Sequence, residues 1–428
     1  MENEVCERCK PLFEKCIGKL EKRIEELERR LLAYENAHTP PSRLRWQPRE
    51  PPAKEKKLGA PEGHPGTTRP EPDPTMTITI EESKCRKCKA TLGEPFHIER
   101  RIIEEIPEPQ PIEVTEYRIG HYQCAKCGEI TVADAPIPDE GCFGPRACAQ
   151  VALLKFSDRL PHKLVVRALE RQFGITLTPA TVLDITRRVS DAVQSKYERL
   201  ISKIRQSAYV HIDETELKVA CKKYYVWVFT TPTETLYVIR PTRGHEVPEE
   251  ILGVEYQGIV VCDGWKVYTH FGSAQQRCWA HLLREAKYLA QEHETAKGLY
   301  EGLKRMFKKL KKVLARQSSR KEWWHKQFIK EMQQWIDLAN AYREMRKFGT
   351  TLQNGLYQWF TCILHPSVPP TNNHAERQLR ELVVQRKIIG TLRTDKGTTI
   401  MERIMSMLMT WKQQDINQLT ALQKALTS

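Results

Sequence analysis

Four consecutive apolar residues, Ile259 to Cys262, run directly into Asp263 and Gly264. A strand without alternation between apolar and polar residues is typical of a sheet that is covered on both faces. Asp263 would then lie at the carboxyl end of a buried strand, which is where open α/β sheets bind ligands. The segment therefore predicts an α/β fold with a helix-covered sheet and a polar site at the end of this strand.

Val, Ile, Tyr and Trp dominate three earlier segments, which predict neighbouring strands at 208–217, 223–231 and 235–241. In the first segment Val210 and Ile212 share one face, so His211 and Asp213 project from the other. Residues 278–289 and most of 301–347 have helical patterns, and the second stretch is crowded with lysine and arginine. We expect a mixed sheet from about residue 206 onward, joined to helices.

The composition of the chain favours some classes of binding partner over others. The chain has 428 residues, enough for two or three domains, and a formal net charge of +14 that is spread along its length. This excess favours a polyanionic partner such as nucleic acid, although basic proteins also bind anionic lipids or acidic proteins. No run approaches the roughly 18 apolar residues of a membrane span, and no signal-peptide pattern opens the chain. We expect a cytoplasmic protein, without a membrane partner, whose 13 cysteines are thiols or metal ligands.

Residues 1–38 predict a coiled-coil helix. Apolar side chains recur at alternating spacings of four and three, at Phe13, Ile17, Leu20, Ile24, Leu27, Leu31 and Tyr34. About three heptads are near the minimum for a stable pair, so the helix predicts a homodimer or higher oligomer, with a solitary solvated helix as the alternative. Residues 39–76 predict a basic, proline-rich linker, which either lies along phosphates or acts as a solvated tether.

Two CxxC pairs predict a zinc ribbon over residues 77–140. Cys85 and Cys88 form the first pair, and Cys124 and Cys127 form the second. Four thiolates at this spacing suit the closed tetrahedral coordination of structural Zn²⁺, although thiols buried without metal are the alternative. A further group has only three cysteines, and its metal binding stays open: Cys6, Cys9 and Cys16.

Residues 141–205 predict a helical domain with a helix-turn-helix pattern. Two short amphipathic helices meet near Gly174, and Thr178 and Pro179 suit the N-cap and first position of the second helix. On that helix Arg187 and Arg188 are candidate DNA contacts. Helix pairs with glycine turns are also common in plain helical bundles, so both readings stay open.

Phosphoryl transfer by two divalent ions, Mg²⁺ or Mn²⁺, about 4 Å apart, needs a third carboxylate beside Asp213 and Asp263. Glu376 is the candidate, because Thr371 or Asn372 can cap a helix that carries this side chain inward. The chain contains 54 acidic residues, so the residues by themselves leave many other triplets open.

The strings HIDET, VVCDGW, CWAHLLREAKYL and TNNHAERQLRELVVQRKIIGTLRT resemble the catalytic core of insertion sequence sixty-six family transposases. The layout of the amino-terminal segments is also similar, so the resemblance covers nearly the whole chain. It implies a ribonuclease-H-like catalytic domain of the DDE group at 206–415, with a helical insertion at about 291–360 and a tail at 416–428. The positions that match the family's catalytic triad are Asp213, Asp263 and Glu376.

The resemblance implies a DNA transposase of a bacterial or archaeal insertion sequence, which cleaves at the element's ends and joins them to target DNA. Expected phosphate contacts in the core are Arg377, Arg380, Arg386, Lys387 and Arg393, and expected supporting residues are His211, Trp265, His281 and Asn373. After Lys387 the chain reads Ile-Ile-Gly where the family usually has Asn-x-Leu-Phe, which leaves DNA-end specificity open. A catalytically silent DNA-binding protein and a metal nuclease that cuts without joining are the alternatives.

Overall fold

The computed structural model describes residues 17–18, 20–21, 23–24, 70–109, 112–134, 137, 141–316 and 319–427. Contacts divide the chain into one unit of residues 1–42 and 111–428 and a second unit of residues 43–110. Most of the predicted coiled coil and the linker up to residue 69 lie outside the described residues, as do Cys6, Cys9 and Cys16. None of the described helices is both long enough and apolar enough to span a lipid bilayer.

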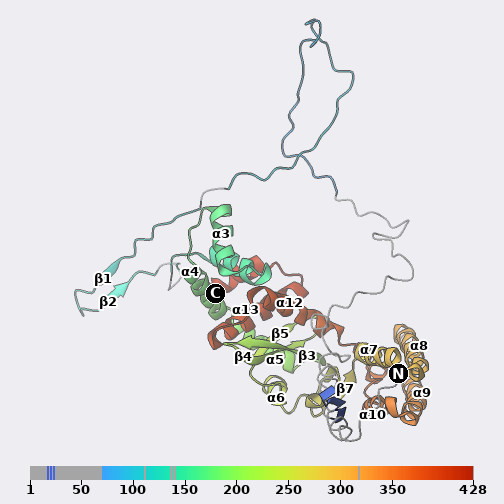
Figure 1. The fold of residues 1–428 in the computed structure, drawn as a ribbon. Coiled ribbons are helices and arrows are strands. Elements are labelled where there is room, and N and C mark those ends of the chain that lie inside the picture. The colour runs from blue at the N-terminus through green and yellow to red at the C-terminus, as the bar shows by residue number, and fades with distance from the viewer. Residues whose placement is uncertain are drawn as a thin grey trace, which may run out of the picture. The chain divides into compact units, whose positions relative to one another are not determined.

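A five-stranded mixed sheet forms the centre of the first unit (Figure 1). Strands β3 (Tyr209–Val219), β4 (Lys222–Thr230) and β5 (Thr235–Arg240) form an antiparallel meander. Strands β6 (Ile259–Cys262) and β7 (Ala274–Arg277) add to the other side of β3 in parallel, in the order β5-β4-β3-β6-β7. The expected strands are confirmed, and Val210, Ile212 and Val260 are fully buried.

The pattern of apolar residues in the sequence does not predict strand β7. Its central residues are Gln275 and Gln276, which are buried although they are polar. The Gln276 side chain accepts the N–H of Cys362 at 2.8 Å and donates to the carbonyl of Trp359 at 3.3 Å. Hydrogen bonds to a distant segment therefore replace apolar burial, which explains why this strand has no apolar signature.

Helices α12 (Asn373–Ile389) and α13 (Asp395–Gln413) pack against the antiparallel part of the sheet. Helix α13 covers β5 and supplies polar partners to its backbone. The N–H of Tyr237 donates to Ser406 Oγ at 2.8 Å, and the N–H of Ile239 donates to Glu402 Oε1 at 2.6 Å. An edge strand with free N–H groups would pair with other chains, so these bonds close that edge.

The helices before the sheet are α2 (Pro145–Ala152), the π-helix Leu153–Ser157, α3 (His162–Phe173), α4 (Pro179–Ala192) and α5 (Gln194–Arg205). The predicted cap is confirmed, since Thr178 accepts the N–H of Thr181 at 3.1 Å. Helix α4 contacts α2, α3 and α13, and one hydrophobic core continues from these helices into the sheet. Residues expected as a tail include helix α14 (Gln418–Leu426), which packs on α2 and buries Leu422 completely.

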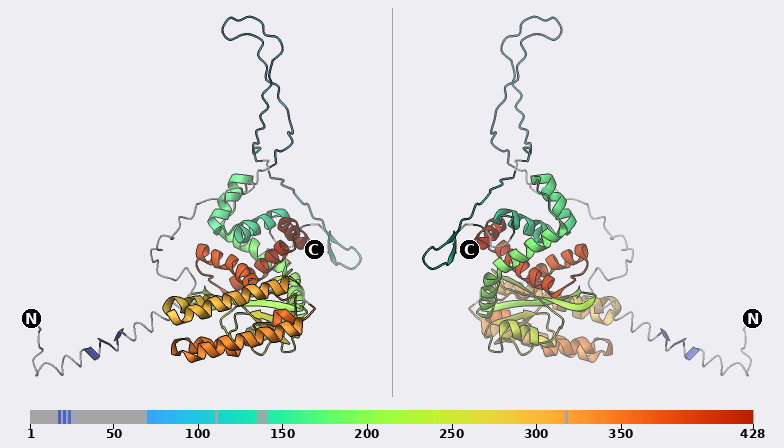
Figure 2. Two further views of the ribbon diagram at one scale, coloured as in Figure 1. Left: turned by 90° about the vertical axis from the view of Figure 1, so that its right-hand side faces the viewer. Right: turned by 90° about the vertical axis from the view of Figure 1, so that its left-hand side faces the viewer.

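Between β7 and α12 the chain forms a helical region with its own hydrophobic core. Its main helices are α7 (Trp279–Glu292), α8 (Lys297–Ala315), α9 (Lys321–Ala341), α10 (Arg346–Asn354) and α11 (Thr361–Leu364). The long helices α8 and α9 lie side by side (Figure 2). Trp279, Phe328 and Phe360 are completely buried among them. Short helices complete the unit: α6 (Glu246–Leu252) and the 3-10 turns Lys266–Tyr268, Glu294–Ala296 and Arg343–Met345.

Candidate active site

Asp213 and Asp263 lie beside each other on adjacent strands. The parallel register of β3 and β6 pairs Tyr209 with Ile259, Val210 with Val260 and His211 with Val261. Continuing this pairing by two residues beyond His211 and Val261 brings Asp213 level with Asp263. Neighbouring strands are about 4.8 Å apart, so the two carboxylates meet at this end of the sheet.

The electrostatics of Asp213 are those of a carboxyl group surrounded by other acids. Burial raises the pKa of Asp213 well above its usual range, and the charges of Glu214, Asp263 and Glu376 raise it further. The backbone N–H of Glu214, which donates to Asp213 Oδ1 at 3.0 Å, acts in the opposite direction. Burial and the neighbouring negative charges thus favour the protonated form of the Asp213 carboxyl group.

Glu376 lies in the first turn of α12 and faces the first turn of α7. Its Oε1 atom is 3.5 Å from Nδ1 of His281, and its Oε2 atom is 3.9 Å from the guanidinium of Arg284. Cys278 precedes α7 and completes a group of three potential metal ligands with His281 and Glu376, all within 4.8 Å of one another. The site thus brings the third predicted carboxylate to the predicted supporting residue His281.

Asn372 holds the start of α12 against the sheet. Its side chain donates to the carbonyl of Ile212 at 2.8 Å and lies 2.9 Å from Nδ1 of His211, while its backbone N–H donates to Cys278 Sγ at 3.1 Å. Asn372 occupies the N-cap position, but its side chain makes no capping bond because it makes these contacts instead. The expected supporting residue Asn373 is exposed, so the buried supporting amide is that of Asn372.

Two histidines support this part of the sheet and are held neutral. Burial lowers the pKa of His211 to about 4, and burial also lowers the pKa of His374. His374 Nε2 lies within hydrogen-bond distance of Thr230 Oγ1 and the carbonyl of Thr231, at 3.1 and 2.9 Å. These contacts indicate that both imidazoles position α12 on the sheet.

The turn after β6 requires glycine. Asp263 Oδ1 accepts the N–H of Trp265 at 2.9 Å, and Gly264 between them has a φ of +93°. A Cβ atom at Gly264 would lie 2.9 Å from Cδ of Arg277. The turn therefore fixes the carboxylate of Asp263 through a backbone conformation that other residues adopt only with strain.

A second acidic residue, Glu214, belongs to the same cluster and was not predicted. It is held by the hydroxyl of Tyr268 and by the guanidinium of Arg243, whose Nε donates to Glu214 Oε1 at 2.8 Å. Arg243 in turn stacks on Trp265, with its Cζ atom 3.9 Å from the ring centroid. Glu214 follows Asp213 in the HIDET string, so adjacency to a site residue was the available signal.

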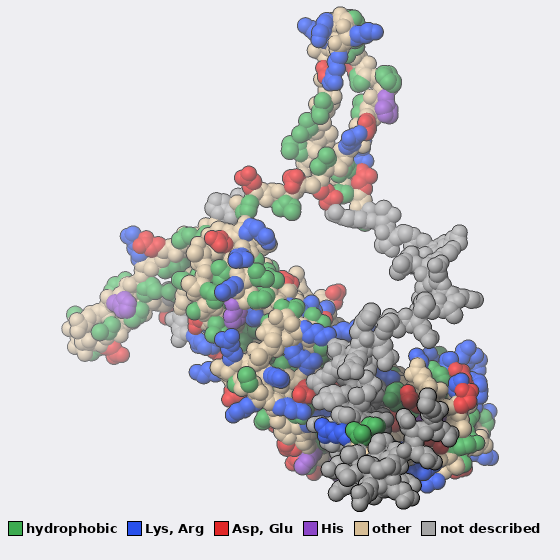
Figure 3. All heavy atoms as spheres, in the orientation of Figure 1, with side chains coloured by type: hydrophobic (Ala, Val, Ile, Leu, Met, Phe, Trp, Pro, Cys, Tyr) green, Lys and Arg blue, Asp and Glu red, His purple; other side chains and the backbone are tan. Residues whose placement is uncertain are grey.

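The seven predicted DNA contacts fall into two groups. Arg187 is paired with Asp184 and Asp191 on its own helix, and Arg386 donates to the carbonyl of Glu216 on β3. Most of the others are exposed, with Arg188 half-buried: Arg188, Arg377, Arg380, Lys387 and Arg393. Lysine and arginine side chains recur over the face of the molecule seen in Figure 3.

The two CxxC pairs adopt the same local turn, and they belong to different units. In each turn the residue four places after the first cysteine has a positive φ, Lys89 at +63° and Gly128 at +76°, and donates its N–H to that cysteine's carbonyl. Backbone N–H groups of the turn lower the pKa of Cys85 and of Cys124. Strands β1 (His121–Gln123) and β2 (Ile130–Val132) flank the second turn.

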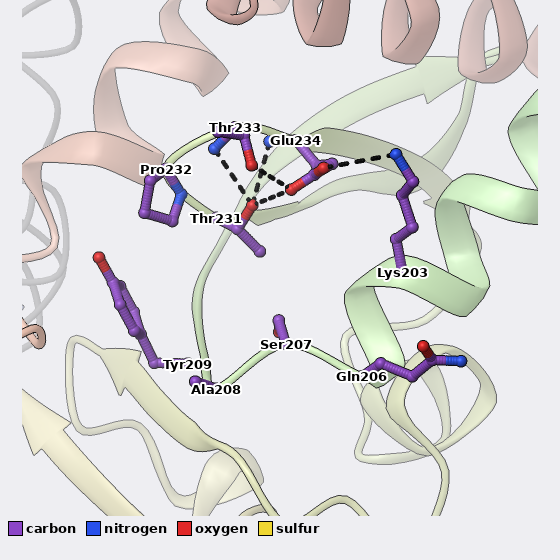
Figure 4. Close-up of a pocket in the computed structure, with 9 residues that line it drawn as sticks. All are labelled: Lys203, Gln206, Ser207, Ala208, Tyr209, Thr231, Pro232, Thr233 and Glu234. Atoms are coloured by element: carbon purple, nitrogen blue, oxygen red, sulfur yellow. Dashed lines mark hydrogen bonds and ion pairs between the residues drawn. The ribbon is translucent and has the colours of Figure 1, made fainter.

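A cavity of about 430 Å³ lies at the opposite end of β3, and none of the candidate site residues lines it (Figure 4). Tyr209 borders it from the strand, and Thr231 and Glu234 border it from the β4–β5 turn. Glu234 accepts hydrogen bonds from Thr231 Oγ1 and Thr233 Oγ1, each at 2.6 Å, and lies 3.7 Å from Nζ of Lys203. The carboxylate in this cavity is therefore already satisfied by the protein.

Comparison with known proteins identifies the family of the chain. The sequence model of the transposase IS66 family matches residues 140–400, more than half of the chain, and this span includes Asp213, Asp263 and Glu376. The comparison with curated proteins gives no match. The matched span also covers the whole mixed sheet and the helical region between β7 and α12. The chain belongs to the IS66 family of transposases.

Proposed function

We propose that this protein is a DNA transposase of a bacterial or archaeal insertion sequence, with Asp213, Asp263 and Glu376 as its catalytic carboxylates on a ribonuclease-H-like sheet. The observation that carries the proposal is the β3–β6 register, which brings Asp213 level with Asp263. The raised pKa of Asp213, to which Asp263 and Glu376 both contribute, supports a single shared site. Strand register thus supports the two aspartates that the sequence indicated, and the charge interaction with Asp213 supports Glu376.

The donor set fits two hard divalent cations, Mg²⁺ or Mn²⁺. Carboxylate oxygens are the ligands these ions prefer, and the buried Asp213 has acidic neighbours. Asp213, Asp263 and Glu376 would be the residues that hold these ions. When bound, such ions activate an attacking oxygen and stabilise the leaving oxygen of a phosphodiester.

The chain's own residues position the DNA for hydrolysis at each element end and for attack of the freed 3′-hydroxyl on target DNA. Arg377 and Arg380 lie on the exposed part of α12, close in sequence to Glu376, and suit backbone phosphates. Lys387 and Arg393 extend this basic segment. The Arg386 guanidinium, bound to β3, positions α12 instead.

The remaining predictions concern the amino-terminal segments. We propose that Cys85, Cys88, Cys124 and Cys127 bind structural Zn²⁺, which the lowered pKa of Cys85 and Cys124 supports because zinc binds thiolates. The prediction that α4 recognises DNA has less support, because the exposed Arg187 already forms ion pairs with Asp184 and Asp191. Joining two DNA ends requires a dimer or higher oligomer, for which the predicted coiled coil is the proposed contact.

The test is incubation of the purified full chain with labelled DNA carrying the element's ends, with Mg²⁺ or with chelator. Glu376→Gln removes one proposed metal ligand, and Glu255→Gln changes an exposed acid of the segment between α6 and β6 as a matched control. We expect metal-dependent nicking and joining in the wild type and control, and neither in Glu376→Gln. Binding without cleavage in the wild type would favour the silent DNA-binding protein, and cleavage without joining would favour a nuclease.

A further inference from the structure

We propose that Cys278, His281 and Glu376 form a separate binding site for one thiophilic divalent cation of the Zn²⁺ class. The sulfur, the imidazole nitrogen and a carboxylate oxygen lie within 4.8 Å of one another. Cys278 and His281 come from the start of α7, and Glu376 comes from the first turn of α12. The two helix starts also meet through hydrogen bonds from the backbone N–H of Asn372 to Cys278 Sγ and from the N–H of Trp279 to the carbonyl of Pro370.

The carboxylate of Glu376 lacks a hydrogen bond where it faces this group. Its Oε1 atom is buried without a hydrogen-bond partner, and its nearest basic atom is Nδ1 of His281 at 3.5 Å. A buried acceptor without a partner is destabilising, and a cation between the two side chains would remove that cost. The position of the orphaned oxygen is thus the position at which a ligand is needed.

The sulfur of Cys278 is held in place by a hydrogen bond. Cys278 is fully buried, and the backbone N–H of Asn372 donates to its Sγ at 3.1 Å. N–H donors to a thiolate commonly orient metal ligands from the second coordination shell.

The distances among the three ligand atoms suit Zn²⁺ if the side chains move slightly closer together. Bonds of about 2.3 Å to sulfur and about 2.0 Å to nitrogen or oxygen make the edges of a tetrahedral site roughly 3.3–3.6 Å long. The three ligand atoms lie within 4.8 Å of one another, and side-chain rotations that move each atom by about 1 Å would bring them into this range. One sulfur, one nitrogen and one oxygen ligand favour Zn²⁺ over Mg²⁺, and three protein ligands leave one coordination position open.

Binding at this site would compete with the proposed catalytic ions for Glu376. An ion held by Cys278 and His281 draws the Glu376 carboxylate toward α7 and away from Asp213. Excess Zn²⁺ should therefore inhibit Mg²⁺-dependent cleavage, and Cys278→Ser should relieve that inhibition. This consequence rests on the proposed function, whereas the binding of the cation does not.

The experiment measures the binding of Co²⁺, a spectroscopic probe for Zn²⁺, to the full chain. The amount bound is measured by equilibrium dialysis, and coordination by sulfur is measured by the absorption of the sulfur-to-cobalt band. Cys278→Ser is compared with Cys362→Ser, which changes an equally buried cysteine outside the group. We expect Cys278→Ser to lose one equivalent of Co²⁺ and the matching part of the band. Cys362→Ser should bind as the wild type does. The control also subtracts any signal of the CxxC pairs, which both variants retain.

His281→Asn gives a second route to the same answer if Cys278→Ser does not fold, since the His281 side chain is 15% exposed and tolerates replacement better. Asp213→Asn should keep the cobalt band, because Asp213 is not a ligand of this site. Equal Co²⁺ content and equal spectra in the wild type and in folded Cys278→Ser or His281→Asn would overturn the proposal. These readouts do not depend on DNA cleavage, so they separate this proposal from the proposed function.

Discussion

The two ends of the parallel β3–β6 pair surround their acidic residues in opposite ways. At the amino end, Glu234 beside the cavity accepts two hydroxyl hydrogen bonds and faces Lys203. At the carboxyl end of the pair, where β6 stops beside the middle of β3, Asp213 is half-buried, accepts the backbone N–H of Glu214 and has other carboxylates as neighbours. The carboxylate at the first end has hydroxyl and basic partners, whereas the one at the second end has acidic neighbours.

The difference indicates which end would need a cation. Protein interiors compensate buried charges unless the charge has a use, because an isolated buried carboxylate is expensive. Thr231 and Glu234 beside the cavity already have hydrogen-bond partners. Asp213 instead has Asp263 and Glu376 as charged neighbours, and the divalent cations proposed above would offset the repulsion among these carboxylates.

The largest expected effect is on the rate of DNA cleavage. Replacing an acid at the carboxyl end should lower this rate, whereas replacing an acid at the amino end should not. Asp213→Asn removes a proposed metal ligand without changing shape, and we expect strand cleavage to fall by about 10³-fold or more. Glu234→Gln changes an acid by the same chemistry at the other end and should leave the cleavage rate within about twofold. Both rates are measured on labelled element ends with Mg²⁺. Full activity in Asp213→Asn would remove the contrast between the two ends.

A second prediction concerns His211, which lies on β3 between the two ends. Its pKa is lowered from 6.5 to about 4 by burial, so the unfolded chain binds its proton first as the pH falls. The stability is therefore complete above pH 6.5 and is lost progressively down to about pH 4, by about 3 kcal/mol in total. His211→Gln should lack this loss when the free energy of unfolding is measured against pH.

His245 offers the control for this prediction, because its side chain is 71% exposed. His245→Gln should show the same loss of stability between pH 6.5 and 4 as the wild type does. If His211→Gln kept the wild-type pH dependence, the neutral histidine would not contribute to the junction between the sheet and α12.

The third effect is on stability at the carboxyl end. Gly264→Ala places a side chain at a φ of +93° and 2.9 Å from Cδ of Arg277, so we expect a loss of about 2 kcal/mol. Gly174→Ala places a side chain in the left-handed helical region, at a φ of +65°, with open space around it, and should cost about 1 kcal/mol. Chemical denaturation of both variants isolates the crowding at Arg277. Equal losses would show that Arg277 moves aside freely.

The smallest effect is expected at the amino end. Thr231→Val removes a buried hydroxyl that donates to Glu234 at 2.6 Å and accepts its N–H at 3.0 Å, and we expect a loss of about 1 kcal/mol with cleavage unchanged. Thr233→Val removes a more exposed hydroxyl that donates to the same carboxylate, and should cost less. A loss of cleavage in Thr231→Val would mean that the two ends of β3 are coupled.

Much of the sheet could be predicted from its residues. The segments that became β3, β4, β5 and β6 are rich in β-branched and aromatic residues, because their side chains are buried by apolar contact. Strand β7 could not be predicted, because its central side chains are buried by hydrogen bonding: Gln276 bonds to Trp359 and Cys362, more than 80 positions away, and Gln275 donates to the carbonyl of Tyr268. A single-sequence pattern carries information on apolar burial but not on such partners.

The candidate site divides in the same way. Asp213 and Asp263 end or interrupt apolar strands, so a local pattern indicated them. Asn372 stands next to the expected Asn373, and only the tertiary contacts with Ile212 and Cys278 distinguish the two amides. Glu214 was missed because neighbours on a strand point to opposite faces, and its partners Arg243 and Tyr268 come from later segments.

Helix α14, the last described helix, is a structural support of the helices before the sheet. It contacts α2 and α4, and Leu422 is completely buried. Leu422 and Ala425 belong to the same hydrophobic core as Val210 and Ile212 of β3. Removing α14 would therefore uncover part of the core that supports the sheet, rather than trim a free tail.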